Sequence, residues 1–260
     1  WRLIKLSAMS LKILYWDKHY VAIDKPAGLL VHRSPISRDR VFVLQTLRDQ
    51  LARRVYPVHR LDRATSGVLL FGLSAEAARR MTTLFEARQV NKEYLAVTRG
   101  WIDDHGLIDH PVADAEGGGR AQSARTEFRR LAKVELPFMV DRYPSARYSL
   151  VSVTPQTGRR QQIRKHFKHI SHHLIGDTTH GNGRHNRFFR SHFGIRRLLL
   201  MARRLAFVHP YYQTYINIVA DDDADWRLIS AIFARPPSGP PTDTRVQRSK
   251  NAADRAGGLE

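Results

Sequence analysis

Residues 58–70 read Val58-His59-Arg60-Leu61-Asp62-Arg63-Ala64-Thr65-Ser66-Gly67-Val68-Leu69-Leu70. This stretch places one acidic side chain, Asp62, between two arginines and just before a turn of small residues that leads into an apolar strand. The cations Arg60 and Arg63 favour the charged form of the carboxylate, which predicts an ionised nucleophile rather than a proton donor. Taken alone, the same residues also fit a salt-bridge cluster on the surface.

Short apolar segments bounded by turn residues predict many β-strands on both sides of this stretch. The expected strands are residues 13–15, 21–24, 68–73, 94–99, 125–134, 148–154, 197–207 and 214–219. Ser74 is the expected N-cap of a helix that runs to about Arg88. The apolar residues at helical spacing in it are Ala77, Met81, Leu84 and Phe85. Residues 161–169 and 225–234 predict two further helices. Many strands with few helices predict an α+β fold with a mixed, largely antiparallel central β-sheet flanked by helices and loops.

One catalytic domain is expected over residues 9–234. Met9 looks like a start, so we interpret residues 1–8 as an N-terminal extension. Residues 235–260 combine four prolines with Gly, Asp, Arg and Lys and predict a disordered tail. Gly117-Gly118-Gly119 predict a flexible surface loop rather than a phosphate cradle, because no Lys-Ser/Thr pair follows them.

The composition points to a polyanionic partner. The 260 residues include 43 Lys and Arg against 24 Asp and Glu, a net charge of +19, and 42% of the residues are apolar. Such a chain can bury a core and neutralise phosphates at its surface, although a basic but inert surface would have the same composition. The chain has no cysteine, which excludes disulfides and thiolate chemistry. No apolar run reaches the roughly 18 residues of a membrane span, so we expect a soluble, cytoplasmic protein without a membrane partner.

The charge is concentrated in residues 156–204, which contain 12 Lys or Arg, 7 His and a single acid, Asp177. Four phenylalanines are interleaved with these cations: Phe167, Phe188, Phe189 and Phe193. They suit stacking against RNA bases, but for any one of them burial in the core is the favoured alternative.

His166, His169 and His173 are spaced so that one helical face presents all three. Zinc sites usually add Cys or a carboxylate at fixed spacing, and this stretch has neither. We therefore expect a histidine-rich face on an RNA-binding surface, and no metal.

The stretch at Asp62 resembles the catalytic signature of the large pseudouridine synthase family that modifies ribosomal and transfer RNA. The resemblance rests on His59-Arg60-Leu61-Asp62 and Thr65-Ser66-Gly67. Other segments agree with the family in the expected order: Asp24-Lys25-Pro26-Ala27-Gly28, Lys92-Glu93-Tyr94, Thr157-Gly158-Arg159 and Gln162-Ile163-Arg164-Lys165-His166. The resemblance extends from about Leu11 to Ala234. Gln161 and Met201 depart from it, because relatives often have histidine at both positions.

The resemblance implies an enzyme that isomerises uridine to pseudouridine with no cofactor and no metal. Asp62 would be the nucleophile, acting at the sugar or at the base; Tyr94 would stack against the freed uracil. Arg164 would pair with Asp62 and keep it oriented and ionised, and Leu200 would form an apolar floor beneath the base. Arg60 would fill the space that the flipped uridine leaves. Further expected substrate contacts are Arg159, Lys25 and His32.

Within the family, two regions resemble the branch that isomerises uridine-65 at the acceptor-stem end of the T arm of tRNA. They are residues 31–34 and residues 175–181, the latter with the following Asn186-Arg187. The alternatives are a synthase acting on large-subunit ribosomal RNA and a non-catalytic RNA-binding protein on the same fold. The resemblance also implies a monomer.

Overall fold

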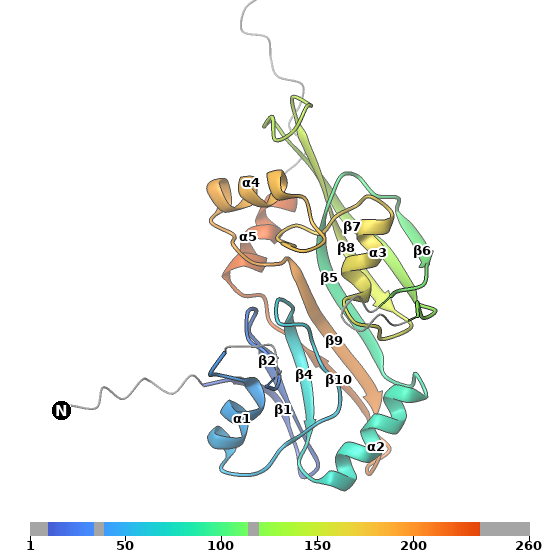
Figure 1. Ribbon diagram of the computed structural model, residues 1–260. Coiled ribbons are helices and arrows are strands. Elements are labelled where there is room, and N and C mark those ends of the chain that lie inside the picture. Colours follow the sequence, from blue (N-terminus) through green and yellow to red (C-terminus); the bar gives the residue numbers. More distant parts are fainter. Residues whose placement is uncertain (1–9, 34–38, 114–119, 235–260) are drawn as a thin grey trace, which may run out of the picture.

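The computed structural model describes residues 10–33, 39–113 and 120–234 (Figure 1). The expected N-terminal extension, the loop at Gly117-Gly118-Gly119 and the expected C-terminal tail lie outside the described residues.

The described part of the chain forms ten strands and five helices. The strands are β1 (Lys12–Trp16), β2 (Tyr20–Lys25), β3 (Tyr56–Pro57), β4 (Ser66–Gly72), β5 (Asn91–Arg99), β6 (His105–Asp109), β7 (Arg125–Leu136), β8 (Ala146–Pro155), β9 (Leu200–Val208) and β10 (Tyr215–Val219). The helices are α1 (Val43–Leu51), α2 (Ala75–Glu86), α3 (Gln162–His169), α4 (Gly183–Phe193) and α5 (Ala224–Phe233). None of the helices within these residues has the length and apolar character to cross a membrane.

The strands form one mixed sheet in the order β1-β2-β4-β9-β5-β8-β7-β6, with β3 beside β4 and β10 beside β9. Among the described strands, β4 and β9 pair in parallel, and the other pairs are antiparallel. The parallel contact is short: Ser66 pairs with Met201, and Gly67 pairs with Ala202. The expected α+β fold with a largely antiparallel central sheet is therefore confirmed.

Alternation along the strands sends successive side chains to opposite faces of the sheet. In β4, Val68 and Leu70 join a core cluster with α2, α4 and α5, whereas Leu69 and Phe71 join a cluster with α1. A third cluster packs α3 against β8 on the same face as α1. Tyr94 of β5 contacts both the α1 cluster and the α3 cluster. Figure 1 shows α1 and α3 on either side of β9 and β5.

Several elements differ from the sequence-based expectation. Helix α1, strands β3 and β6, and helix α4 were not expected. Helix α1 has no side-chain hydrogen bond at its N-cap Phe42, so it lacks the usual start signal. Helix α4 does have a capping residue, because the Asn182 side chain accepts from the Arg184 N–H, but its many cations obscure the apolar spacing. Strand β9 begins at Leu200, three residues later than expected, because Arg197 is held by Ser66 and Asp223.

Candidate active site

Asp62 lies in a tight turn between β3 and β4. The turn is closed by a hydrogen bond from the Thr65 N–H to the Asp62 carbonyl, at 3.1 Å. Gly67, just beyond it, has φ +105°, and a Cβ there would lie 2.2 Å from the Ala202 carbonyl oxygen. A glycine is therefore required where β4 meets β9. The close parallel contact between β4 and β9 thus explains why a glycine follows the Asp62 turn at position 67.

The segment at Lys25 fastens this turn. Lys25 is fully buried, and its ammonium donates to the carbonyl oxygens of Pro26, Arg63 and Thr65 at 2.9, 3.2 and 2.8 Å. Gly28 and Arg63 exchange two more hydrogen bonds, N–H to carbonyl at 2.8 Å and Nε to carbonyl at 3.0 Å. Burial lowers the pKa of Lys25 to about 7, and nearby Asp62 opposes this change.

The sequence predicts that Lys25 contacts the substrate, but the structure turns its ammonium group inward. An ammonium group has three N–H donors, and those of Lys25 are directed at two backbone carbonyls of the turn, Arg63 and Thr65, and at the carbonyl of the adjacent Pro26. Its role is to hold the Asp62 turn in place.

His59 attaches the other side of the turn to the sheet. Its Nε2 accepts a hydrogen bond from the Leu70 N–H at 3.0 Å, and its ring stacks on Phe85 with centroids 4.8 Å apart. Burial, assisted by nearby Lys92, lowers the pKa of His59 to about 3. The imidazole is therefore neutral near pH 7, as its acceptor role requires, and it serves as an anchor.

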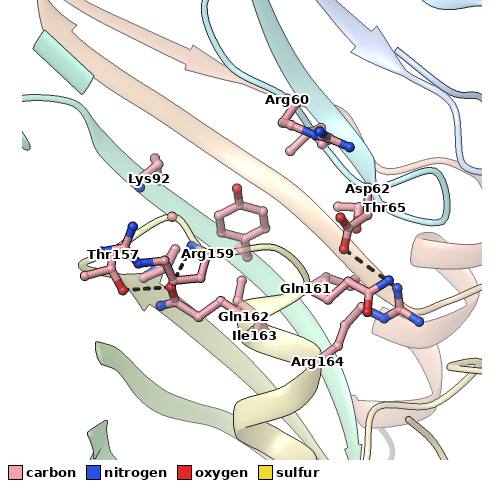
Figure 2. Close-up of a pocket in the computed structure, with 15 residues that line it drawn as sticks. Arg60, Asp62, Thr65, Lys92, Thr157, Arg159, Gln161, Gln162, Ile163 and Arg164 are labelled. Atoms are coloured by element: carbon pink, nitrogen blue, oxygen red, sulfur yellow. Dashed lines mark hydrogen bonds and ion pairs between the residues drawn. The ribbon is translucent and has the colours of Figure 1, made fainter. Parts of the chain in front are cut away.

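Arg164 of α3 faces Asp62 across the pocket (Figure 2), as expected, with Nη1 3.7 Å from Asp62 Oδ2. Its closer partner is Asp177, which accepts from Nε and Nη2 at 2.8 Å each. Asp177 also accepts from the backbone N–H groups of Thr179 and His180 at 2.9 Å. Burial opposes charge on Arg164, but the hydrogen bonds and negative charges of Asp177 and Asp62 together outweigh burial and raise the pKa of Arg164.

Asp177 was missed as a functional residue. It is the single acid of the basic segment 156–204 and is almost fully buried. A lone carboxylate among many cations was the signal that could have identified it as their partner.

Tyr94 and Leu200 line the same pocket as Asp62 and Arg159. Leu200 is buried on β9 and supplies the expected apolar surface. Burial, with a smaller contribution from the negative charge of Asp62, raises the pKa of Tyr94. The phenol therefore stays protonated at neutral pH, so its ring face and its hydroxyl group are what it presents to a ligand.

The pocket brings together most of the site predicted from sequence. Six predicted residues line it: Arg60, Asp62, Tyr94, Arg159, Arg164 and Leu200. Arg60 and Arg159 are exposed at its mouth. His32 is also exposed but does not line this pocket. Arg63, expected to favour the charged form of Asp62, is instead ion-paired with Asp39 at 3.1 Å.

The expected histidine-rich face does not form. Helix α3 ends at His169, and Ser171 has φ +62°, so the chain turns away before His173. His166 is fully buried, with its Nε2 2.9 Å from the His110 carbonyl oxygen. In the described residues, no group of three or more His, Cys, Asp or Glu side chains is arranged to hold a metal ion.

The alternative assignment of the phenylalanines to the core is confirmed. Phe167, Phe188 and Phe189 are buried, and Phe193 packs partly buried against the same cluster as Phe188 and Phe189. Their burial leaves the neighbouring cations, and not the rings, for contact with a polyanion.

Comparison with known proteins identifies the family of this site. The model of the RNA pseudouridylate synthase family matches residues 19–169. A tRNA pseudouridine synthase C of Pasteurella multocida is 48% identical over 86% of this chain and 97% of its own length. One of Vibrio cholerae is 46% identical over 86% of this chain and 96% of its own. The structure of human RNA pseudouridylate synthase domain containing 1 superposes with a TM-score of 0.66 at 24% identity, covering 90% of this chain and 98% of that chain.

Proposed function

Because the chain belongs to the RNA pseudouridylate synthase family, we propose that its substrate is tRNA and its target is uridine-65 in the T arm. The chain is an RNA pseudouridine synthase, an isomerase. The tRNA assignment is supported by relatives that carry that name and are 48% and 46% identical along almost their whole length. The position is supported by the resemblance of residues 31–34 and 175–181 to the branch that modifies uridine-65.

Asp62 is the nucleophile in this proposal. Its carboxylate attacks C1′ of the ribose or C6 of uracil, and the bond between C1′ and N1 breaks with its electron pair leaving on uracil. The freed ring turns so that C5 faces C1′, a C5–C1′ bond forms, and the carboxylate is released. The proton on C5 is lost, and one proton is gained at N1, so the product is an isomer of the substrate.

Arg164 supports this step electrostatically. Its Nη1 is 3.7 Å from Asp62 Oδ2, so its positive charge faces the carboxylate that we assign as the nucleophile. Since its other nitrogens are bound to Asp177, the guanidinium is already oriented before RNA arrives, and little reorganisation accompanies the reaction.

Tyr94 holds the uracil while it turns. The neutral phenol ring stacks against the base, as aromatic side chains do with unstacked nucleotides, and its hydroxyl lies near the proton that leaves C5. Leu200 packs on the base from below. The pocket therefore keeps the freed ring close to C1′ without binding it in one orientation.

The uridine reaches this pocket by leaving its helix. Extrusion of a base costs a few kcal/mol of unpairing and unstacking. Arg60 stands exposed at the pocket mouth, two residues before Asp62, and occupies the vacated space. In this proposal, the positively charged side chains around the mouth of the pocket contact the phosphate backbone of the RNA. Asp62, Tyr94 and Arg164 come from a single chain, so the pocket is complete within that chain. The proposal keeps the monomer that the family resemblance implies, and places the enzyme on tRNA in the cytoplasm.

The observation that carries this proposal is the Asp62–Arg164 pair beside Tyr94 in one pocket. The test incubates the protein with unmodified tRNA and with ribosomal RNA and maps new pseudouridines by carbodiimide chemistry, with Asp62→Ala in parallel. We expect one new site, at position 65 of tRNA, that is lost in the variant. A single site in ribosomal RNA would replace the tRNA assignment, and binding without product on either RNA would support the non-catalytic alternative.

A further inference from the structure

Lys92 lies in the same pocket and has no role in the mechanism above. It is two residues before Tyr94 on β5, so both side chains leave the same face of the strand. Figure 2 places Lys92 on the wall near Thr157 and Arg159, on the side of the pocket away from Asp62. Lys92 and Asp62 therefore line different sides of one pocket.

No described residue compensates the charge of Lys92. Its ammonium makes no hydrogen bond or ion pair with the parts of the chain that the structure describes. The adjacent acid, Glu93, leaves the opposite face of β5, where it accepts from Ser152 at 2.9 Å. Partial burial, and then the positive charge of Arg88, lower the pKa of Lys92. A half-buried cation without a partner is costly in free energy, so this position favours an incoming anion.

The other groups around Lys92 also leave an anion as the best ligand. His59 beside it is neutral, because burial holds its pKa at about 3. Asp62 is turned toward Arg164 on the far side of the pocket. Arg159 and Arg60, which share the pocket with Lys92, are exposed cations. The Lys92 side of the pocket is therefore electropositive.

We propose that Lys92 binds a backbone phosphate next to the target uridine and so positions the extruded nucleotide over Tyr94. Each nucleotide brings one phosphate charge, and a lysine ammonium is a compact charge that suits such a group. The inference rests on the assignment of the chain as an RNA pseudouridine synthase but not on the choice of tRNA or of position 65. Lys92 in this role is a substrate-binding residue and takes no part in the bond changes.

The test uses the full chain and a short RNA hairpin that the wild-type protein modifies. The hairpin is also made with an uncharged methylphosphonate at the linkage 5′ or 3′ to the target uridine. The variants are Lys92→Met, Lys92→Arg and, as a matched control, Lys18→Met, an exposed lysine in the turn between β1 and β2. Thermal unfolding establishes that each variant is folded.

We expect Lys92→Met to raise KM about tenfold with kcat nearly unchanged, the pattern of an interaction present in both ground and transition states. The dependence of log KM on log salt should fall by about one unit of slope, and Lys92→Arg and Lys18→Met should stay near wild type. At one of the two linkages, the methylphosphonate should raise the KM of the wild-type protein and leave the KM of Lys92→Met unchanged. The proposal would be overturned if the methylphosphonates weakened the wild-type protein and Lys92→Met equally at both linkages. It would also be overturned if Lys92→Met lowered kcat and left KM unchanged.

These outcomes are separate from a failure of the proposed substrate. If the T arm of tRNA is not the target, the wild-type protein fails to modify that hairpin, and the same comparison is made on the RNA that it does modify. A misassigned target thus affects all proteins equally, whereas a misassigned Lys92 affects only the comparison between variants.

Discussion

Arg164 is bound more closely to Asp177 than to Asp62: two of its nitrogens donate to Asp177 at 2.8 Å, and its third lies 3.7 Å from Asp62. The guanidinium fork suits this bidentate arrangement. Asp177 thereby determines where Arg164 points, and Arg164 in turn faces the carboxylate that we assign as nucleophile. Asp177 therefore acts on the reaction only through Arg164 and does not itself contact the substrate in this proposal.

Asp177→Asn should reduce kcat by tenfold to a hundredfold with little change in KM. The amide replaces one acceptor oxygen with a donor, so Arg164 loses both a hydrogen bond and its fixed orientation. Breaking a buried pair also costs about 3 kcal/mol of unfolding free energy. Single-turnover kinetics and urea unfolding measure the two effects. Asp62→Asn is the control: it should abolish turnover and change stability by less than about 1 kcal/mol. Unchanged kcat in Asp177→Asn would remove Asp177 from the mechanism.

Arg164→Lys should reduce kcat by a hundredfold or more although the charge is kept. A lysine ammonium is a point charge and cannot hold Asp177 in a bidentate contact while reaching Asp62. RNA affinity, measured by filter binding, should change less than threefold because Arg164 is buried. Wild-type turnover in this variant would show that the fork geometry is unimportant.

Lys25→Met should reduce kcat and stability without changing the salt dependence of RNA binding. The substitution leaves two carbonyl oxygens of the Asp62 turn and that of Pro26 without their donor, at a cost of about 1–3 kcal/mol for each buried group that finds no other partner. Urea unfolding and the slope of log Kd against log salt are the measurements. A smaller salt slope would instead mean that Lys25 contacts a phosphate, as first expected from the sequence.

Gly67→Ala should destabilise the fold by about 3 kcal/mol or more, because the new methyl group meets a backbone carbonyl at a close strand contact. Gly28→Ala is the matched control. Gly28 also has positive φ, +87°, but a Cβ there has no atom within 4 Å, so only the conformational cost of about 1 kcal/mol applies. Comparison of the two urea midpoints separates steric clash from backbone strain, and equal losses would contradict the close contact between β4 and β9.

The stability of the protein should depend on His59 below neutral pH. Burial lowers the pKa of His59 from 6.5 to about 3, so between these values the unfolded chain binds a proton that the folded chain does not. Its contribution is full above pH 6.5 and is lost as the pH falls toward 3, by at most about 1.4 kcal/mol per pH unit. His59→Gln retains an acceptor for the Leu70 N–H but does not titrate. Urea unfolding at pH 7.5, 6 and 5 should show a smaller loss in this variant, and parallel losses would contradict the neutral buried imidazole.

Elements with a strong local signal were predicted correctly from sequence. Strand β4 and helix α2 were identified because their apolar spacing and the Ser74 cap are local features, and the structure retains both, with the Ser74 side chain accepting from the Ala77 N–H. Asp62, Tyr94 and Arg164 were identified as one site from their resemblance to a family, and the structure places them in one pocket. Their chemical roles and the target position stay predictions that the experiments above test.

Long-range features were predicted poorly. The burial of Lys25 and the pairing of Arg164 with Asp177 depend on which backbone groups and charges the sheet brings together. Phe188 and Phe189 were left open for a similar reason. A core position was favoured for each, but an aromatic residue among cations is also consistent with an RNA contact until the opposing surface is known.

The amino-acid sequence by itself determined the strand-rich α+β class, the excess of positive charge and the identity of the acid, the tyrosine and the arginine that we assign to the reaction, because alternation, composition and motif residues are properties of the chain. Only the tertiary structure decided which cations are available to RNA. It bound Arg164 to Asp177, placed Lys25 under the Asp62 turn and left Lys92 without a partner among the residues that the structure describes. The cost of burying a charge depends on neighbours that the sheet supplies from distant parts of the chain.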